Sequence, residues 1–153
     1  TRAAHAAALS GRTDKETTMD LDHDTRVQAL ARPVVYVHPN DTLRQCATML
    51  VEESVGAALV RGPHGAVGLV TERDIVKAIA EGASASRTTV YDIMNDGELV
   101  TVGPHDDVLD AAHRMLDAEV RHIPIFENGT AAGMLSARDA LRALVAERDE
   151  ATA

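Results

Sequence analysis

The sequence predicts a mixed α/β (α+β) protein built from two β-α-β-β-α repeats that pack on each other with pseudo-two-fold symmetry. The first observation is that residues 68–74, Gly-Leu-Val-Thr-Glu-Arg-Asp, recur sixty-five residues later as Gly-Met-Leu-Ser-Ala-Arg-Asp at 133–139. The second is that residues 37–79 match 102–144 without a gap. Repeats of this length are too small to bury an apolar face alone, so we expect the two copies to cover each other.

The first copy, assigned to residues 25–82, shows alternating strand and helix signals. β-Branched apolar runs indicate strands, and amphipathic stretches that follow Thr or Asp residues indicate capped helices. The Gly62-Pro63-His64-Gly65 segment has strong turn chemistry, and Gly82 is a helix stop. The expected elements are, in order, strand 34–37, helix 42–53, strands 57–60 and 66–70, and helix 72–80, with Ile75, Val76 and Ile79 buried.

The remaining segments are assigned by composition. Residues 83–89 are small and polar and are expected to link the first copy to the second, at 90–147. Residues 1–24 are expected to be an N-terminal arm, in which 3–9 could form a short helix that docks on a partner subunit. Residues 148–153 are expected to form a C-terminal tail.

Composition excludes several classes of function. The chain has 153 residues, of which 45% are hydrophobic and 25% charged, as in an ordinary globular protein. A formal net charge of -9 argues against nucleic-acid and anionic-membrane partners, and the three aromatic residues form no stacking platform for bases. Without a signal peptide or an apolar run long enough to span a membrane, and with Cys46 as the only cysteine, we expect a cytoplasmic protein.

The repeated turn allows two compatible interpretations. In Thr71-x-x-Asp74 and Ser136-x-x-Asp139, the hydroxyl and the carboxylate can form a capping box at the start of a helix. The same turn can present N–H groups to a phosphate, while the Asp accepts hydrogen bonds from the hydroxyls of a sugar.

Signals for catalysis and for metal binding are missing. The sequence has no phosphate-binding loop of the Gly-x-x-x-x-Gly-Lys type, no Gly-x-Ser-x-Gly elbow and no Cys-x-x-Cys. His38, His64, His105 and His113 do not have the spacing of metal ligands. We therefore expect no enzyme activity and no metal, and Cys46 is expected to be a buried structural thiol on an apolar helix face.

The pattern of strand, Val-x-Pro, helix, apolar strand, Gly-Leu-Val-Thr-x-Arg-Asp and helix, present twice, resembles a tandem pair of CBS domains, also called a Bateman module. The resemblance covers roughly residues 27–146. It implies that an adenosyl ligand binds in the cleft between the repeats: AMP, ADP or ATP, with NAD-type or S-adenosylmethionine-type compounds as further possibilities. It also implies that the bound ligand regulates a partner protein rather than reacting.

The resemblance also implies roles for individual residues. Asp74 and Asp139 match the carboxylate that binds ribose, and Thr71 and Ser136 match the hydroxyl that contacts ribose or phosphate. The remaining candidates are the residues beside the adenine-binding backbone and those near the phosphates: Val37, Val102, Arg121, His122 and Pro124.

The first copy departs from the family pattern, because Gly56-Ala57-Ala58-Leu59 has neither the basic pair nor the proline. Its phosphate contacts are left open among Arg73, Arg138 and Arg121. Arg73 and Arg138 can equally pair with an Asp, and His122 can equally be a buried histidine bonded to a carbonyl.

Two hypotheses of function follow, together with a remote third, a small metal-dependent hydrolase. The first is a nucleotide-sensing module with unequal sites, in which Asp139 matters more than Asp74. The second is a ligand-independent dimerisation or scaffold protein. In both we expect a homodimer held by two apolar helix stripes, which are Leu43/Ala47/Leu50 and Val108/Ala112/Met115. Gly68 and Gly133 are expected to be structural.

Overall fold

The structure is a computed structural model that describes residues 25–153, so the predicted N-terminal arm and its helix 3–9 lie outside the described residues. The elements are, in order, η1 (Val27–Leu30), β1 (Tyr36–Val37), α2 (Leu43–Glu52), β2 (Ala57–Gly62), β3 (Gly65–Thr71), α3 (Glu72–Ala80), α4 (Val90–Ile93), α5 (Val108–Ala118), β4 (His122–Glu127), β5 (Thr130–Ser136) and α6 (Ala137–Thr152).

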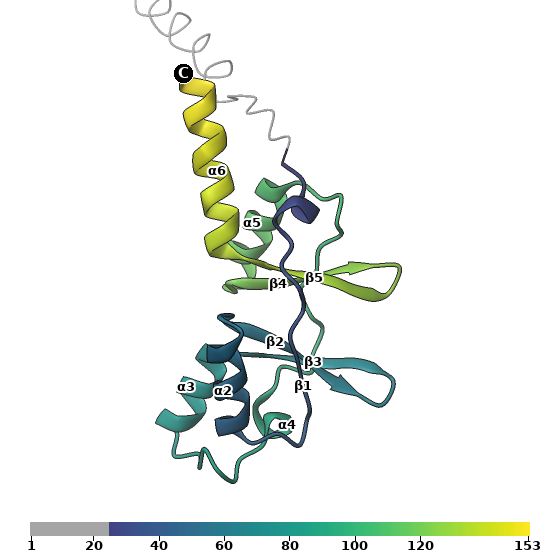
Figure 1. Cartoon of the computed structure of the whole chain (residues 1–153), viewed down its shortest axis with the longest axis vertical. Helices are drawn as coiled ribbons and strands as arrows, with labels where there is room; N and C mark the ends of the chain where they lie inside the picture. The colour runs from purple at the N-terminus through teal and green to yellow at the C-terminus, as the bar shows by residue number, and fades with distance from the viewer. Residues whose placement is uncertain (1–24) are drawn as a thin grey trace, which may run out of the picture.

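Two similar halves lie one above the other, each with its helices on one side and its β-hairpin extending to the other (Figure 1). The lower half has the predicted order β1-α2-β2-β3-α3, with β1 parallel to β2 and β2 antiparallel to β3. The upper half repeats this order as α5-β4-β5-α6, but its first strand is reduced to one parallel bridge between Val102 and Ile125. The predicted fold class is confirmed.

The two hairpins have the same register. Ala57 pairs with Thr71 in the first hairpin, and His122 pairs with Ser136 at the equivalent position in the second. Each ladder is interrupted at the same place, between Val60 and Arg61 in one copy and between Ile125 and Phe126 in the other. Bulges twist a strand locally, so this shared irregularity shows that the copies have the same detailed geometry and are related by a pseudo-two-fold axis.

The predicted element boundaries differ from the structure at two places. Strand β1 is shorter than predicted, because residues 33–35 lead the chain from one half to the other, although the Val35 carbonyl still accepts the Leu59 N–H at 2.9 Å. Helix α6 is longer, and it extends through the residues that were expected to form a C-terminal tail. Its last two turns consist mainly of Ala, Glu and Arg, which are strong helix formers.

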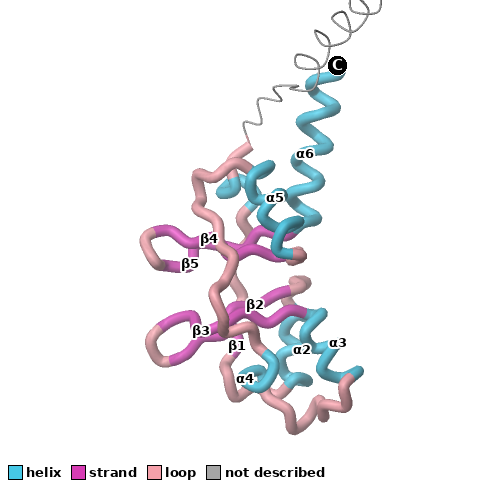
Figure 2. Tube along the Cα trace, turned by 180° about the vertical axis from the view of Figure 1, so that it is seen from behind, coloured by secondary structure: helices cyan, strands magenta, loops and turns pink. Residues whose placement is uncertain are grey.

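The segment that opens each repeat packs on the other repeat, which Figures 1 and 2 show from opposite sides. Val27 of η1 is buried in the core of the second half, and Val90 of α4 is buried in the core of the first. Beyond these helices, Arg32 exchanges two backbone hydrogen bonds of 3.0 Å with Met134, and Asn95 exchanges two of 2.8 and 2.9 Å with Leu69. Arg32 and Asn95 are therefore structural equivalents, and each half needs chain from the other to complete its fold.

Aliphatic side chains form one core inside each half and a third cluster between the two sheets. Leu59 and Leu69 of the first hairpin meet Met134 of the second in this third cluster. Cys46 is fully buried in the first core, and burial raises the pKa of its thiol to about 11, as expected for a structural cysteine.

The predicted dimer stripes are wrong, because Leu43, Leu50, Val108 and Met115 are buried within the protomer. The apolar helix residues that remain exposed do not belong to these stripes. Val76 and Ile79 of α3 were expected in the core, but they are 67% and 45% exposed.

Candidate functional site

A cleft of about 790 Å³ lies between the two halves. One wall is apolar and comes mainly from α2, α3 and the start of β2, including Leu50, Val55, Ala57 and Ile75. The other wall is polar and comes from the segment before β1, the start of β4 and the β5–α6 turn. Its residues are Arg32, Arg121, His122, Ser136, Arg138 and Asp139.

The β5–α6 turn places a carboxylate in this cleft. Ser136 is the N-cap of α6, and its hydroxyl accepts the Asp139 N–H at 3.1 Å. The Ala137 N–H donates to the Arg121 carbonyl at 2.8 Å, which holds the start of β4 beside the start of α6. Asp139 is the one buried charged residue among those that the structure describes, so its side chain must be compensated by partners.

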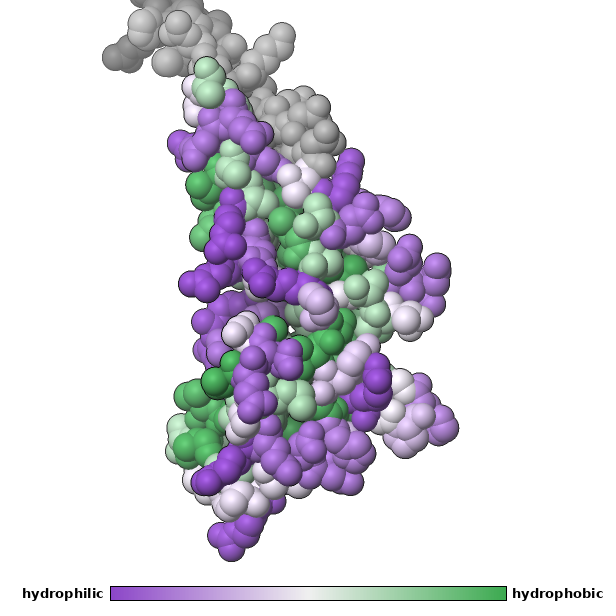
Figure 3. All heavy atoms as spheres, viewed as in Figure 1, coloured by the Kyte–Doolittle hydropathy of each residue, from purple (hydrophilic) through white to green (hydrophobic). Residues whose placement is uncertain are grey.

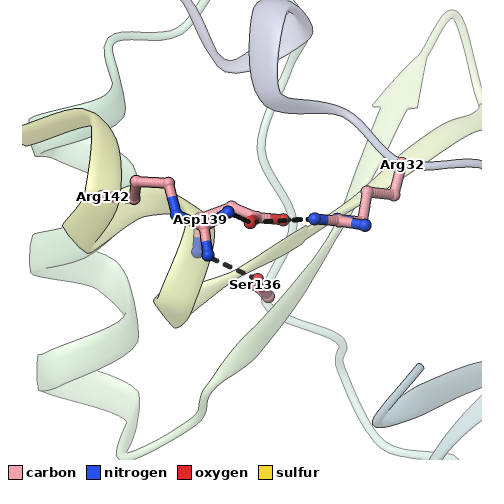
Figure 4. Close-up of polar contacts among 4 residues, drawn as sticks. All are labelled: Arg32, Ser136, Asp139 and Arg142. Carbon is pink, nitrogen blue, oxygen red and sulfur yellow. Dashed lines mark hydrogen bonds and ion pairs between the residues drawn. The ribbon is translucent and has the colours of Figure 1, made fainter. Parts of the chain in front are cut away.

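Two arginines supply this compensation (Figure 4). Arg32 donates from Nε to Asp139 Oδ2 at 2.6 Å and from Nη2 to Oδ1 at 3.2 Å, so both carboxylate oxygens are engaged by one guanidinium. Arg142, one turn along α6, lies 3.4 Å from Oδ1. A forked pair of this kind is a strong charge-assisted interaction, and here it joins residues 107 positions apart in the sequence.

The arginines set the charge state of the site. The hydrogen bond from Arg32 lowers the pKa of Asp139 below its ordinary value, although burial acts in the opposite direction. The positive charges of Arg32 and Arg142 and the hydrogen bond with Ser136 also favour the charged form of Asp139. The same pair raises the pKa of Arg32. At neutral pH the cleft therefore holds a fixed carboxylate surrounded by guanidinium groups.

His122 lies half-buried where the two halves meet. A Cβ placed on Gly56 would lie 2.8 Å from His122 Nε2, so a larger residue at position 56 would require this ring to shift. Burial lowers the pKa of His122, Glu72 opposes that shift, and Arg121 reinforces it. His122 is therefore neutral at pH 7, and its predicted role as a charged phosphate donor is not favoured by this environment.

The first copy of the turn has a different geometry. Thr71 and Asp74 form a complete capping box, in which the Asp74 carboxylate accepts the Thr71 N–H at 2.9 Å and the Thr71 hydroxyl accepts the Asp74 N–H at 3.2 Å. Neither residue lines the cleft, and Arg73 is exposed to solvent. The structural-cap interpretation holds for this copy.

The structure thus brings together five of the predicted site residues, which are Arg121, His122, Ser136, Arg138 and Asp139. The side chains of Val37, Val102 and Pro124 are buried in the repeats, so these residues can offer a ligand only their backbone. The roles of all these residues in binding stay predictions.

Sequence reasoning missed Arg32. Arg32 precedes the first predicted strand of the first repeat, and nothing local shows that it pairs with the second. Arg32 is brought to Asp139 by the crossing of the segments that open the two repeats.

Residues 25–153 contain neither a cluster of metal-binding side chains nor a membrane-spanning helix. No group of three or more His, Cys, Asp or Glu side chains there could hold a metal ion. In the same part of the chain, no helix has the length and apolar character needed to cross a membrane.

Comparisons with known proteins identify the repeats. The CBS domain family matches residues 27–81 and 90–146. The mitochondrial CBS domain-containing protein CBSX3 of Arabidopsis thaliana is 37% identical over 116 residues, which cover 72% of this chain and 56% of CBSX3. The chain therefore spans little more than half the length of that relative.

Solved structures share the arrangement. A CBS-domain protein of Agrobacterium tumefaciens is 32% identical, with a TM-score of 0.73 over 78% of this chain and 99% of that one. A CBS domain protein of Pyrobaculum aerophilum, complexed with AMP, is also 32% identical, with a TM-score of 0.68 over 75% of this chain and 89% of that one. The chain belongs to the CBS domain family and carries two CBS domains in tandem.

Proposed function

We propose that the protein is a regulatory module that binds an adenine nucleotide in the cleft between its two CBS domains and passes the binding signal to a partner. The observation that carries this proposal is the buried Asp139 carboxylate, which faces a cleft with one apolar wall and one basic wall. Support also comes from the Pyrobaculum aerophilum relative, which was solved with AMP.

Each part of a nucleotide has a matching surface. The Asp139 carboxylate and the Ser136 hydroxyl suit the two hydroxyls of a ribose. Arg121 and Arg138 suit phosphate oxygens, since guanidinium groups bind them with paired, charge-assisted hydrogen bonds. The apolar wall, including Val55 and Ile75, suits the flat adenine ring. A volume of about 790 Å³ is within the usual range of small-molecule sites.

Binding at this position has a mechanical consequence. The cleft is lined by both repeats, so one ligand contacts both halves at once. A ligand that binds the joined arrangement more tightly than a separated one shifts the population toward the joined arrangement. The regulatory role of the module follows from this coupling.

The test is a thermal-shift panel with AMP, ADP, ATP, NAD and S-adenosylmethionine on the parent chain and on Asp139→Asn. A ligand present at 100 times its dissociation constant adds about 2.7 kcal/mol of stability, which corresponds to roughly 5–15 °C in Tm for a chain of this size. We expect a shift in the parent that Asp139→Asn reduces. Asp74→Asn is the matched control, because it makes the same change at an equivalent carboxylate that does not line the cleft. If no compound shifts the parent, nucleotide sensing is contradicted.

A second candidate function, ligand-independent dimerisation or scaffolding, is favoured by an apolar face that both repeats expose. Val51 and Leu116 occupy equivalent positions on α2 and α5 and are 78% and 74% exposed. Val76 and Leu141 are also equivalent, on α3 and α6, and both are exposed. Hydrophobic side chains gather on this side of the molecule in Figure 3. Exposed apolar residues at equivalent positions of both repeats are typical of a protein interface, and a second copy would match their symmetry.

This proposed homodimer is tested by combining Val51→Glu with Leu116→Glu. Like charges facing each other across a two-fold interface cost several kcal/mol, so the dissociation constant should rise at least about 100-fold. Light scattering should show a parent dimer and a monomeric double variant. Tyr91→Glu is the control, because it places the same charge at an exposed apolar residue of α4, outside α2 and α5. A parent that is monomeric at micromolar concentration contradicts the homodimer.

A further inference from the structure

The ion pair between Arg32 and Asp139 lies where the proposed ribose contact must form. The guanidinium engages both oxygens of the carboxylate, at 2.6 and 3.2 Å. An ionised carboxylate has about four acceptor positions, of which Arg32 occupies two and Arg142 a third, whereas a sugar diol needs two. A ribose that binds Asp139 through both hydroxyls must therefore displace at least one guanidinium contact, and we take this contact to be that of Arg32.

Arg32 is built to move without disturbing the fold. Its backbone is fixed by two hydrogen bonds of 3.0 Å to Met134, whereas its side chain is 57% exposed. The long, flexible side chain can thus change rotamer while the segment stays paired. When it leaves, Arg142 still lies 3.4 Å from Asp139 Oδ1, so the buried carboxylate keeps one cationic neighbour.

A displaced guanidinium needs a new partner. Asp139 and Glu72 are the acidic residues that line the described cleft, and Glu72, at the start of α3 in the first repeat, already interacts with His122. Arg121 and Arg138 line the same side of the cleft as Arg32, so the displaced group would enter a region that is already cationic. An anionic group of the ligand would resolve this imbalance, since three guanidinium groups could then share its oxygens.

We propose that Arg32 determines specificity at this site: it pairs with Asp139 before binding and transfers to the ligand's phosphate when ribose takes its place. A nucleoside phosphate replaces the ion pair that it breaks, whereas neutral adenosine breaks the pair and supplies no anionic group for Arg32. The site therefore selects phosphorylated adenosyl ligands over the bare nucleoside. This inference rests on the proposed nucleotide-binding function and deepens it.

The test compares AMP with adenosine by calorimetric titration of the parent, Arg32→Gln and Arg26→Gln. In Arg32→Gln, adenosine should bind more tightly and AMP should bind equally or more weakly. The dissociation constant of adenosine divided by that of AMP should therefore fall by about tenfold or more, which is the usual scale for one charge-assisted contact. Arg26 is the control, because it lies on the same segment, is 49% exposed and pairs loosely with Asp107 at 3.9 Å, away from the cleft.

The possible outcomes distinguish a failure of the Arg32 exchange from a failure of the proposed nucleotide binding. An unchanged ratio in Arg32→Gln overturns the exchange. An equal gain in affinity for AMP and adenosine also overturns it, because Arg32 would then only compete with the ligand for Asp139. If neither AMP nor adenosine binds the parent at millimolar concentration, the proposed function fails and the exchange fails with it.

A measurement on the parent alone guards against a misfolded variant. The ¹⁵Nε–H resonance of Arg32 should move on titration with AMP and settle at a phosphate-bound position. A resonance that keeps its Asp139-bound position at saturating AMP contradicts the proposal.

Discussion

The two hydroxyl-x-x-aspartate turns share a sequence pattern and a position in the fold, yet their carboxylates have different partners. Asp74 reaches back to the Thr71 N–H and completes a capping box. Asp139 forms only the hydroxyl half of that box with Ser136, and its carboxylate is bound by Arg32 instead. The residue that crosses from the other repeat makes the difference, since the equivalent of Arg32 beside the first turn is Asn95.

This difference shows that a repeated motif does not define two equal sites. The chain around Asn95 carries Asp96 and Glu98, whereas residues 25–40 around Arg32 include two arginines and no acidic residue. An acidic segment repels phosphate, and a cationic one attracts it. We therefore infer a structural role for the first turn and a binding role for the second.

The largest expected effect concerns the glycines beneath the two turns, where the crossing segments approach most closely. A Cβ on Gly68 would lie 2.8 Å from the backbone oxygen of Asn95, whereas on Gly133 the nearest backbone atom, the Arg32 oxygen, would lie 3.2 Å away. Gly68→Ala should therefore cost about 1–3 kcal/mol of unfolding free energy, and Gly133→Ala should cost less. Urea denaturation measures both.

Gly97→Ala is the control for these variants. Its added Cβ would meet only the Asn95 Oδ1 atom, at 3.4 Å. If Gly68→Ala unfolds at the same urea concentration as Gly97→Ala, the crossing segment is not held tightly against β3.

The next effect separates the caps. Thr71→Ala should destabilise the protein by about 1 kcal/mol, the usual cost of losing an N-cap hydroxyl, and should leave AMP affinity unchanged. Ser136→Ala should cost a similar amount of stability and should also weaken AMP binding severalfold. Ser136→Thr, which keeps the hydroxyl, should restore both. Equal effects of Thr71→Ala and Ser136→Ala on AMP affinity would contradict the division of roles.

The smallest expected effect is on stability in acid. The pKa of Asp139 is lowered in the folded state, mainly by Arg32, so its pairing stabilises the protein fully above the ordinary pKa of 3.8. That contribution is lost as the pH falls through the lowered folded-state pKa. The stability difference between the parent and Arg32→Gln should thus be constant above about pH 5 and shrink below pH 4. A difference that stays constant down to pH 2 would show that Arg32 acts without Asp139.

The local parts of the fold could be predicted from the sequence. Helix 72–80 was predicted with the bounds that α3 has, because Thr71, Asp74 and Gly82 are cap and stop signals within one segment. The two repeats and their register followed from the constant spacing of matched residues.

The crossing segments could not be predicted, because Arg32 and Asp139 are distant in sequence and nothing in their local patterns records the pairing. For a related reason, the apolar face of α3 was mistaken for core. Periodicity shows that Val76 and Ile79 share a face with Ile75, but it does not show whether the same chain covers that face.

We expect the second turn to bind ligand and the first turn not to bind it. Calorimetric titration of AMP into the parent, Asp139→Ala and Asp74→Ala tests it most directly, with Asp139→Asn as the variant that keeps the side-chain volume. Losing a charged hydrogen-bond acceptor should weaken binding by about one to two decades in the Asp139 variants, while Asp74→Ala should bind like the parent. Equal losses in the two alanine variants, or a larger loss in Asp74→Ala, would contradict the account.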